Sequence, residues 1–295
     1  MSLPPDVVAG FTKLDEQVWL VPGAEHGGLN AMLVDDGEVV LFDAGLPDAL
    51  ARRLAPHVDL CVLTHCPFEV AQGARHFREV WAPHAEARAL LSLHDHLEVY
   101  GVGSRDRALV ESTLQRAGWA PRPPDKRYRV GGMVQLDTTR WQMVPAPGHT
   151  PGLTLFLEPK RHVLFASDLD GAEDRLYGWP ASDLDELAKT FDSMAELDVA
   201  LLVGSRAEPR KRGIRPLLRE KAAELRARDL VVLQRLDHPR TPEDLALTGL
   251  FTTVDRLADP MARYVERVMV EKHVARLIER NLVMARQDGR YQRVD

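Results

Sequence analysis

The sequence has only two cysteines, Cys61 and Cys66, and no hydrophobic run longer than a β-strand. The spacing of the cysteines matches no zinc finger, and nothing in it supports a disulfide framework. A membrane-spanning helix needs about 20 consecutive apolar residues, so none is expected. Residues 1–10 lack the positive flank and apolar core of a secretory signal peptide, which favours a cytoplasmic location.

The chain also has little charge of one sign, with a formal net charge of −6 over 295 residues. Residues 214–295 hold 16 Lys and Arg against 13 Asp and Glu, a balance of +3, so residues 1–213 carry −9. Dedicated nucleic-acid modules are usually more basic than this. The charge distribution therefore does not favour nucleic acid as a partner. Hydrophobic residues make up 45% of the chain, which fits a globular protein with a substantial core.

Three short apolar segments end in side chains that can ligate a metal. They are residues 60–63 before His65, residues 141–147 before His149, and residues 162–168 with Asp168 at the end. Strand ends in layered α/β folds are where ligands and metals are usually held. Two neutral imidazole nitrogens and one carboxylate form a set that could ligate a single divalent ion.

The pattern around these segments predicts further strands and helices. Strands are expected at 17–22, 30–34, 38–43, 128–137 and 199–203, and helices at 47–54, 70–78, 85–97, 182–195, 214–236 and 261–280. Ser182 is the expected N-cap of its helix, and Asp288-Gly289 predicts a two-residue hairpin turn. His94 and His96 would point about 200° apart on a helix, so we expect surface or half-buried positions rather than a joint metal site.

The order of Thr64-His65, the run PGHTPG at 147–152 and the run FASD at 165–168 resembles the metallo-β-lactamase superfamily, especially its glyoxalase II-like hydrolases. This resemblance covers residues 15–213 and implies an α/β fold, a four-layer αββα sandwich, as domain 1–213. In domain 214–295, a linker helix, further helices and a hairpin look like a winged helix.

The sequence departs from the family's first motif, T-H-x-H-x-D-H. Pro67 and Val70 stand where two histidines belong, Glu69 replaces the aspartate, and Ser205 stands where a final histidine would be. Two-metal hydrolysis is therefore not expected. The resemblance implies one divalent metal at most (zinc, iron or manganese), or none.

The resemblance implies His65, His149 and Asp168 as metal ligands, with Glu69 as a further carboxylate near the ion. Glu69 and Asp168 are the expected catalytic residues, and Glu69 would orient or deprotonate a metal-bound water. The implied partner is a small-molecule substrate, a thioester, ester or lactone. The alternatives are a catalytically silent binding or structural protein that has lost its metal site and, with less support, a nuclease-like role. A homo-oligomer stays open.

Other side chains near the motifs have two interpretations. Cys66 is expected to be a small buried filler rather than a nucleophile or metal ligand. Tyr177 and Trp179 either border the pocket or pack under the next helix. His26 is expected to be a solvated loop histidine.

Overall fold

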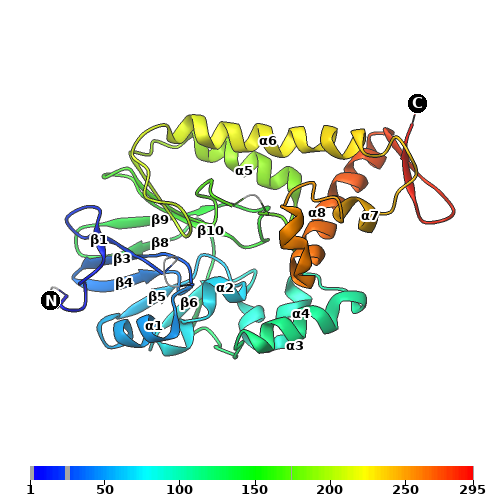
Figure 1. Cartoon of the computed structure of the whole chain (residues 1–295). Helices are drawn as coiled ribbons and strands as arrows, with labels where there is room; N and C mark the ends of the chain where they lie inside the picture. The colour runs from blue at the N-terminus through cyan, green and yellow to red at the C-terminus, as the bar shows by residue number, and fades with distance from the viewer. Residues whose placement is uncertain (1–2, 24–26, 174, 295) are drawn as a thin grey trace.

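The computed structural model describes residues 3–23, 27–173 and 175–294 and contains two β-sheets that face each other (Figure 1). The first sheet consists, in spatial order, of β1 (Thr12–Lys13), β2 (Val18–Val21), β3 (Ala31–Asp36), β4 (Glu38–Phe42), β5 (Leu60–Val62), β6 (Val80–Pro83) and β7 (Lys126–Tyr128). The second consists of β12 (Leu201–Gly204), β11 (Val163–Ser167), β10 (Thr154–Glu158), β9 (Arg140–Pro145) and β8 (Met133–Gln135).

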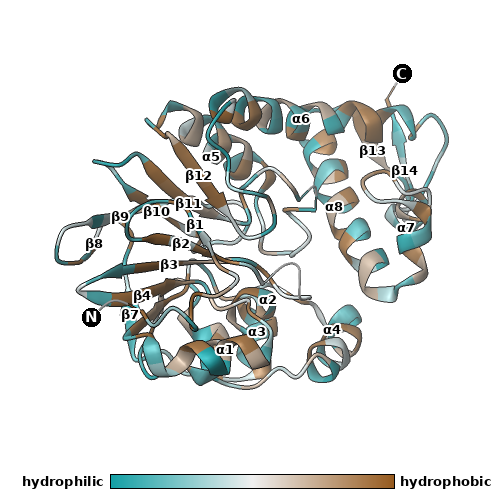
Figure 2. Ribbon diagram, turned by 60° about the vertical axis from the view of Figure 1, so that its left-hand side comes forward, coloured by the Kyte–Doolittle hydropathy of each residue, from teal (hydrophilic) through white to brown (hydrophobic). Residues whose placement is uncertain are grey.

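Aromatic side chains fill the space between the two sheets. Phe42 of the first sheet lies 4.6 Å from Phe156 and 5.3 Å from Trp141 of the second, measured between ring centroids. All residues of β10 and β11 are buried, as expected for strands covered on both faces. Figure 2 shows hydrophobic residues concentrated on the strands. Aromatic side chains bury large apolar areas, so these rings contribute much of the packing between the sheets.

Helices cover the outer face of each sheet. The first sheet is covered by α1 (Asp48–Leu54), α2 (Phe68–Ala71) and α3 (Leu93–Val99), and the second by α5 (Leu184–Glu196) and α6 (Ile214–Gln234). Helix α4 (Ser104–Arg116) packs on α3 and on the C-terminal segment, where its Val110 and Leu114 share a buried cluster with Tyr264 and Val268. A separate buried cluster joins each sheet to its helices. The predicted four-layer α/β sandwich is confirmed.

The helix predicted at 70–78 is wrong. Helix α2 ends at Ala71, and a separate 3₁₀ helix follows at Ala74–His76. The amide of Gly73 donates to the carbonyl of Ala44, and a Cβ at residue 73 would lie 2.7 Å from that oxygen. The helix is therefore interrupted where the backbone of Gly73 packs directly against the loop that contains Ala44.

Two more helix starts differ from the prediction. The prediction of one continuous helix at 85–97 is wrong, because a 3₁₀ helix at Ala87–Leu90 precedes α3. The N-cap of α3 is Ser92, whose side chain accepts a hydrogen bond from the amide of Asp95. Helix α5 has Asp183 as its N-cap, not Ser182. The hydroxyl of Ser182 instead donates to the carbonyl of His149 at 2.7 Å.

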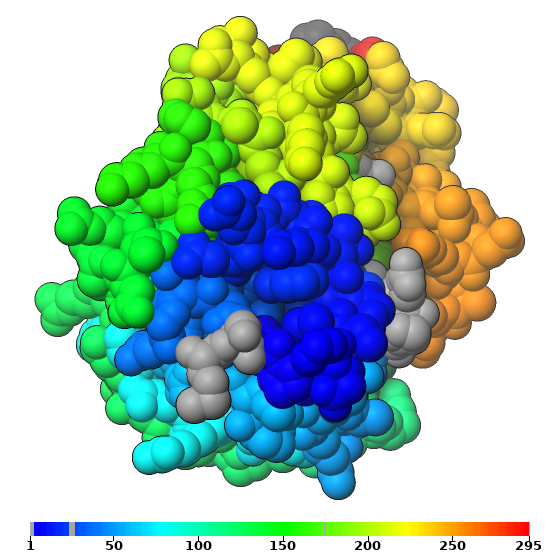
Figure 3. Space-filling model, turned by 90° about the vertical axis from the view of Figure 1, so that its left-hand side faces the viewer, coloured from blue at the N-terminus to red at the C-terminus, as the bar shows by residue number. Residues whose placement is uncertain are grey.

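Residues 214–294 continue from α6 into α7 (Pro242–Ala246), α8 (Pro260–Glu279) and a hairpin of β13 (Val283–Ala285) and β14 (Tyr291–Arg293). Helix α8 contacts α4, α6 and α7. In Figure 3, part of the C-terminal segment, in orange, forms one side of the visible surface next to the yellow residues. The expected hairpin is present, but its turn contains the three residues 287–289 between the paired Arg286 and Arg290 rather than two residues. The winged-helix assignment and the boundary at residue 213 stay predictions. Each helix of the described ranges is too short or too polar to cross a membrane.

Candidate metal centre

Three strand ends bring His65, His149 and Asp168 together. His65 follows β5, His149 follows β9, and Asp168 directly follows β11. The Nε2 atoms of the two histidines are 3.2 Å apart, and each lies 3.4 Å from Oδ2 of Asp168. All three residues are buried. In the described part of the chain, no other group of three His, Cys, Asp or Glu side chains has its ligand atoms as close together.

This triangle has the dimensions of a metal site. Tetrahedral zinc with bonds of about 2.0–2.1 Å has ligand atoms about 3.3–3.4 Å apart, because a tetrahedron's edge is about 1.63 times its centre-to-corner distance. The observed separations of 3.2, 3.4 and 3.4 Å match one face of such a tetrahedron. Three protein ligands leave a fourth position for water or substrate.

The other ring nitrogen of each histidine is held by a neighbour. Nδ1 of His149 donates to the carbonyl of Leu176 at 2.5 Å, and Nδ1 of His65 lies 2.8 Å from Oγ1 of Thr64. The Thr64 hydroxyl donates to Asp43, so its oxygen accepts from His65. Both imidazoles therefore carry their proton on Nδ1, which leaves the Nε2 lone pairs free to bind a metal.

The charges in the triangle favour a cation at its centre. Burial would raise the pKa of Asp168, but the imidazoles of His149 and His65 and the guanidinium group of Arg206 beside it hold that pKa well below its ordinary value. Burial would lower the pKa of His65, yet Asp168 raises it above the ordinary value. Both shifts show that positive charge beside the Asp168 carboxylate is stabilised.

Ser205 and Arg206 engage the second oxygen of Asp168. The hydroxyl of Ser205 donates to Oδ1, and Nε of Arg206 lies 3.5 Å from the same atom. Pro67 and Val70, the other positions where the family motif has histidines, bring no ligand atoms. The outer side of Asp168 thus faces a hydroxyl and a guanidinium group.

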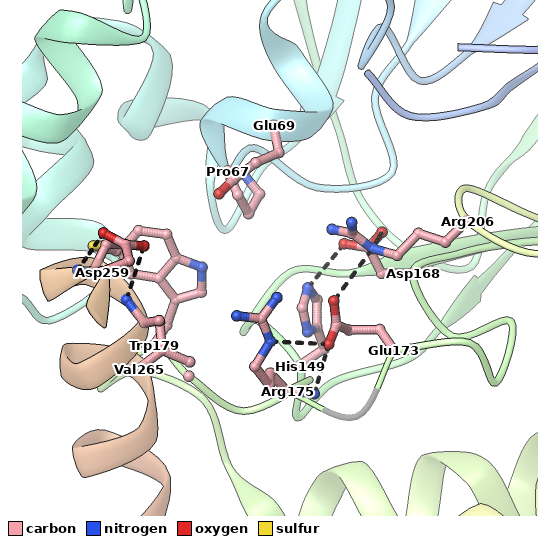
Figure 4. Close-up of a pocket in the computed structure, with 13 residues that line it drawn as sticks. Pro67, Glu69, His149, Asp168, Glu173, Arg175, Trp179, Arg206, Asp259 and Val265 are labelled. Atoms are coloured by element: carbon pink, nitrogen blue, oxygen red, sulfur yellow. Dashed lines mark hydrogen bonds and ion pairs between the residues drawn. The ribbon is translucent and has the colours of Figure 1, made fainter. Parts of the chain in front are cut away.

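Glu69 stands apart from the triangle. Its side chain is exposed, and it lines a cavity of about 180 Å³ that His149 and Asp168 also line. Figure 4 shows Glu69 across the open space from His149. It lies outside the group whose ligand atoms are within 4.8 Å of one another, so its roles as ligand and base stay predictions.

The remaining expectations have mixed outcomes. Trp179 lines the cavity, whereas Tyr177 is fully buried and bonded to His273. Cys66 is fully buried, and burial raises the pKa of its thiol well above the ordinary value, which fits a packing role. His96 was expected at the surface or half buried, which is wrong: it is fully buried, with its ring 4.9 Å from that of Tyr100. His26 lies outside the described residues.

Several residues of the site escaped the sequence analysis. Asp43 fixes Thr64, Arg175 and Arg206 line the cavity, and Met261 and Val265 reach it from α8. Arg206 could have been found, because it directly follows the motif position Ser205. No local signal pointed to the others.

The buried His, His and Asp cluster at the strand ends of this α/β sandwich contains the ligand types that catalytic zinc sites use. Residues 25–206 match the sequence profile of the Metallo-beta-lactamase superfamily. The chain belongs to this superfamily.

Two curated relatives share part of the sequence. An acyl-coenzyme A thioesterase, MBLAC2 of Gallus gallus, is 28% identical over an alignment of 198 residues that covers 61% of this chain and 66% of that protein. A hydroxyacylglutathione hydrolase, GloC of Haemophilus influenzae, is 30% identical over an alignment of 93 residues that covers 29% of this chain and 44% of that protein. The chain thus spans less than two thirds of each relative.

Two solved structures share the fold over nearly the whole chain. A metallo-beta-lactamase family protein from Thermus thermophilus has a TM-score of 0.71 at 20% identity and covers 96% of this chain and 100% of its own. A beta-lactamase domain protein from Burkholderia ambifaria has a TM-score of 0.63 at 17% identity, covering 99% and 95%. The C-terminal helices therefore fall within the shared fold.

Proposed function

We propose that this protein hydrolyses a small thioester, ester or lactone with one divalent metal ion held by His65, His149 and Asp168. The observation that carries the proposal is the triangle of their ligand atoms, with sides of 3.2, 3.4 and 3.4 Å. The similarity to an acyl-coenzyme A thioesterase and a hydroxyacylglutathione hydrolase supports thioesters as the first substrates to test.

A bound divalent ion supplies a Lewis acid for the carbonyl oxygen and lowers the pKa of a bound water. The protein's own groups do the rest. His65 and His149 keep their lone pairs aligned through their Nδ1 hydrogen bonds, and Glu69 at the cavity rim accepts the proton of the attacking water. Water adds to the carbonyl carbon, the C–S or C–O bond breaks, and the leaving group takes a proton.

The second candidate is a binding protein without catalysis. It is favoured by the lost ligands at Pro67, Val70 and Ser205, and by the Ser205 hydroxyl that donates to Asp168 Oδ1. Such a protein would use the same cavity for recognition alone.

Hydrolysis assays separate the two candidates. Protein loaded in turn with zinc, iron or manganese is tested on acetyl-coenzyme A, 4-nitrophenyl acetate and γ-butyrolactone. We expect turnover that His149→Ala abolishes and that Glu69→Gln lowers about 10²- to 10⁴-fold in kcat with unchanged metal content. His238→Ala, at an exposed histidine, is the matched control. Equal activity of wild type and His149→Ala, or no turnover with any metal, would reject the hydrolase.

A further inference from the structure

The cavity beside the candidate metal centre has two chemically different walls. One wall carries Glu173, Arg175 and Arg206, and the other carries Trp179 together with residues of α8. We infer that this cavity selects substrates that combine an apolar part with an anionic group, and that Arg175 binds the anionic group. The hydrolytic part of this inference rests on the proposed function.

One side of the Arg175 guanidinium group is hydrogen-bonded to Glu173, and its other side faces the cavity. Its Nε lies 3.3 Å from Oε1 of Glu173, which also accepts the backbone amide of Arg175 at 2.9 Å. Among the described residues, no partner contacts its two terminal amino groups, and Figure 4 shows its guanidinium group pointing into the cavity. Since the side chain is 28% exposed, it is partly desolvated and fixed before any ligand arrives. A fixed guanidinium edge binds a carboxylate or phosphate through two parallel hydrogen bonds.

Arg206 adds a second positive charge on the same side. Its Nε faces Asp168 at 3.5 Å and Glu173 at 3.8 Å. A guanidinium group stays protonated in proteins, so Arg206 keeps its positive charge here. Glu173 therefore faces both arginines, and Asp168 faces two histidines as well as Arg206. The terminal groups of Arg175 are the part of this charge cluster left for a ligand.

The opposite wall suits an apolar substrate part. Trp179, Met261 and Val265 line it, the latter two from α8. A Cβ at Gly178 would lie 2.6 Å from Cγ1 of Val265, so glycine at this position lets α8 approach closely. Glu69 and Asp259 also border the cavity, but the carboxylate of Asp259 accepts the amides at the start of α8. The substrate class is thus an apolar acyl ester or thioester that also bears a carboxylate or phosphate.

A matched substrate pair tests this specificity. 4-Nitrophenyl hexanoate is neutral, and the mono-4-nitrophenyl ester of adipic acid has the same acyl length with a terminal carboxylate. For the metal-loaded wild type we expect kcat/KM to be higher for the adipate ester. Arg175→Met should lower that value about 10- to 100-fold, chiefly through KM, and change hexanoate hydrolysis less than about twofold. Arg175→Lys should recover part of the loss.

The exposed Arg212 provides the matched control, and Arg212→Met should leave the hydrolysis of both esters unchanged. Equal effects of Arg175→Met on the two esters, or a wild type that prefers the hexanoate, would overturn the inference.

A binding experiment works even if neither ester is hydrolysed. Hexanesulfonate and hexyl phosphate are titrated calorimetrically into full-length protein kept metal-free with a chelator, so that they cannot coordinate a metal. Binding of either anion that Arg175→Met weakens at least about tenfold, with hexanol binding unaffected, supports the anion site independently of catalysis. Comparing the two affinities also shows whether the site prefers a singly charged sulfonate or a phosphate group. No binding to wild type, or equal binding to the variant, contradicts the inference.

Discussion

The phenolic oxygen of Tyr177 lies 2.9 Å from Nε2 of His273, a residue of helix α8 far along the chain. Nδ1 of His273 donates to Asp229 at 2.7 Å, so its Nε2 accepts the Tyr177 proton. The residue before Tyr177 is Leu176, whose carbonyl accepts from Nδ1 of His149. Helix α8 thus holds the segment that orients a proposed metal ligand.

A neighbouring residue of α8 makes a second connection to the same histidine. Nζ of Lys272 donates to the carbonyls of Pro180 at 2.8 Å and Ser182 at 2.6 Å. The hydroxyl of Ser182 donates to the carbonyl of His149. Adjacent residues of α8 therefore hold both ends of segment 176–182, and each end bonds to His149.

We predict that His273→Ala lowers zinc affinity about 10- to 100-fold, because partners that orient a ligand typically contribute this much. Competition with a chromophoric chelator measures the effect. Exposed His238→Ala is the control and should bind zinc like the wild type. If His273→Ala is folded by circular dichroism and binds zinc with unchanged affinity, α8 does not position His149.

We predict that a chain ending at Gly213 aggregates or is strongly destabilised. Ile214, Leu218 and Leu225 of α6 belong to the same buried cluster as Leu187 and Phe191 of α5, and truncation would expose this apolar surface. Size-exclusion chromatography and thermal unfolding test this. A soluble monomeric fragment with the melting temperature of the full chain would show that residues 214–295 are an independent module.

Acid pH should destabilise the protein through His96. Burial lowers the pKa of His96 from 6.5 to about 4. The unfolded state therefore binds the proton more readily, and stability is lost as pH falls from 6.5 towards 4. The shift corresponds to roughly 3 kcal/mol of unfolding free energy.

Chemical denaturation at about pH 7 and about pH 4 checks this prediction. His96→Phe keeps a ring beside Tyr100 and should lose less stability than wild type across that range, while exposed His94→Phe should behave like wild type. Identical pH dependence in His96→Phe and wild type would mean that this histidine is not the titrating group.

The sequence predicted that His65, His149 and Asp168 lie close together, because its signals are local. A buried strand followed by a turn places His65, His149 and Asp168 at strand ends, wherever the rest of the chain lies. Helices α6 and α8 were also predicted within two residues of their ends, because apolar periodicity and a Pro or Gly at the start are local features.

The features that were missed depend on contacts between distant segments. The break after Ala71 follows from the close approach of Gly73 to Ala44, which no local pattern encodes. Arg175 and Val265 line the same cavity although they are far apart in the sequence. Contacts between segments that are distant in the sequence determine these features, and local hydrophobic periodicity does not show such contacts.

Metal stoichiometry tests the central claim most directly. Full-length protein is purified without added metal, reconstituted with zinc, dialysed and measured by elemental analysis alongside His149→Ala and the control His238→Ala. One centre built on His65, His149 and Asp168 predicts one equivalent of zinc per chain in the wild type and the control, and none in His149→Ala. Two equivalents in the wild type, or one equivalent retained by His149→Ala, would contradict it.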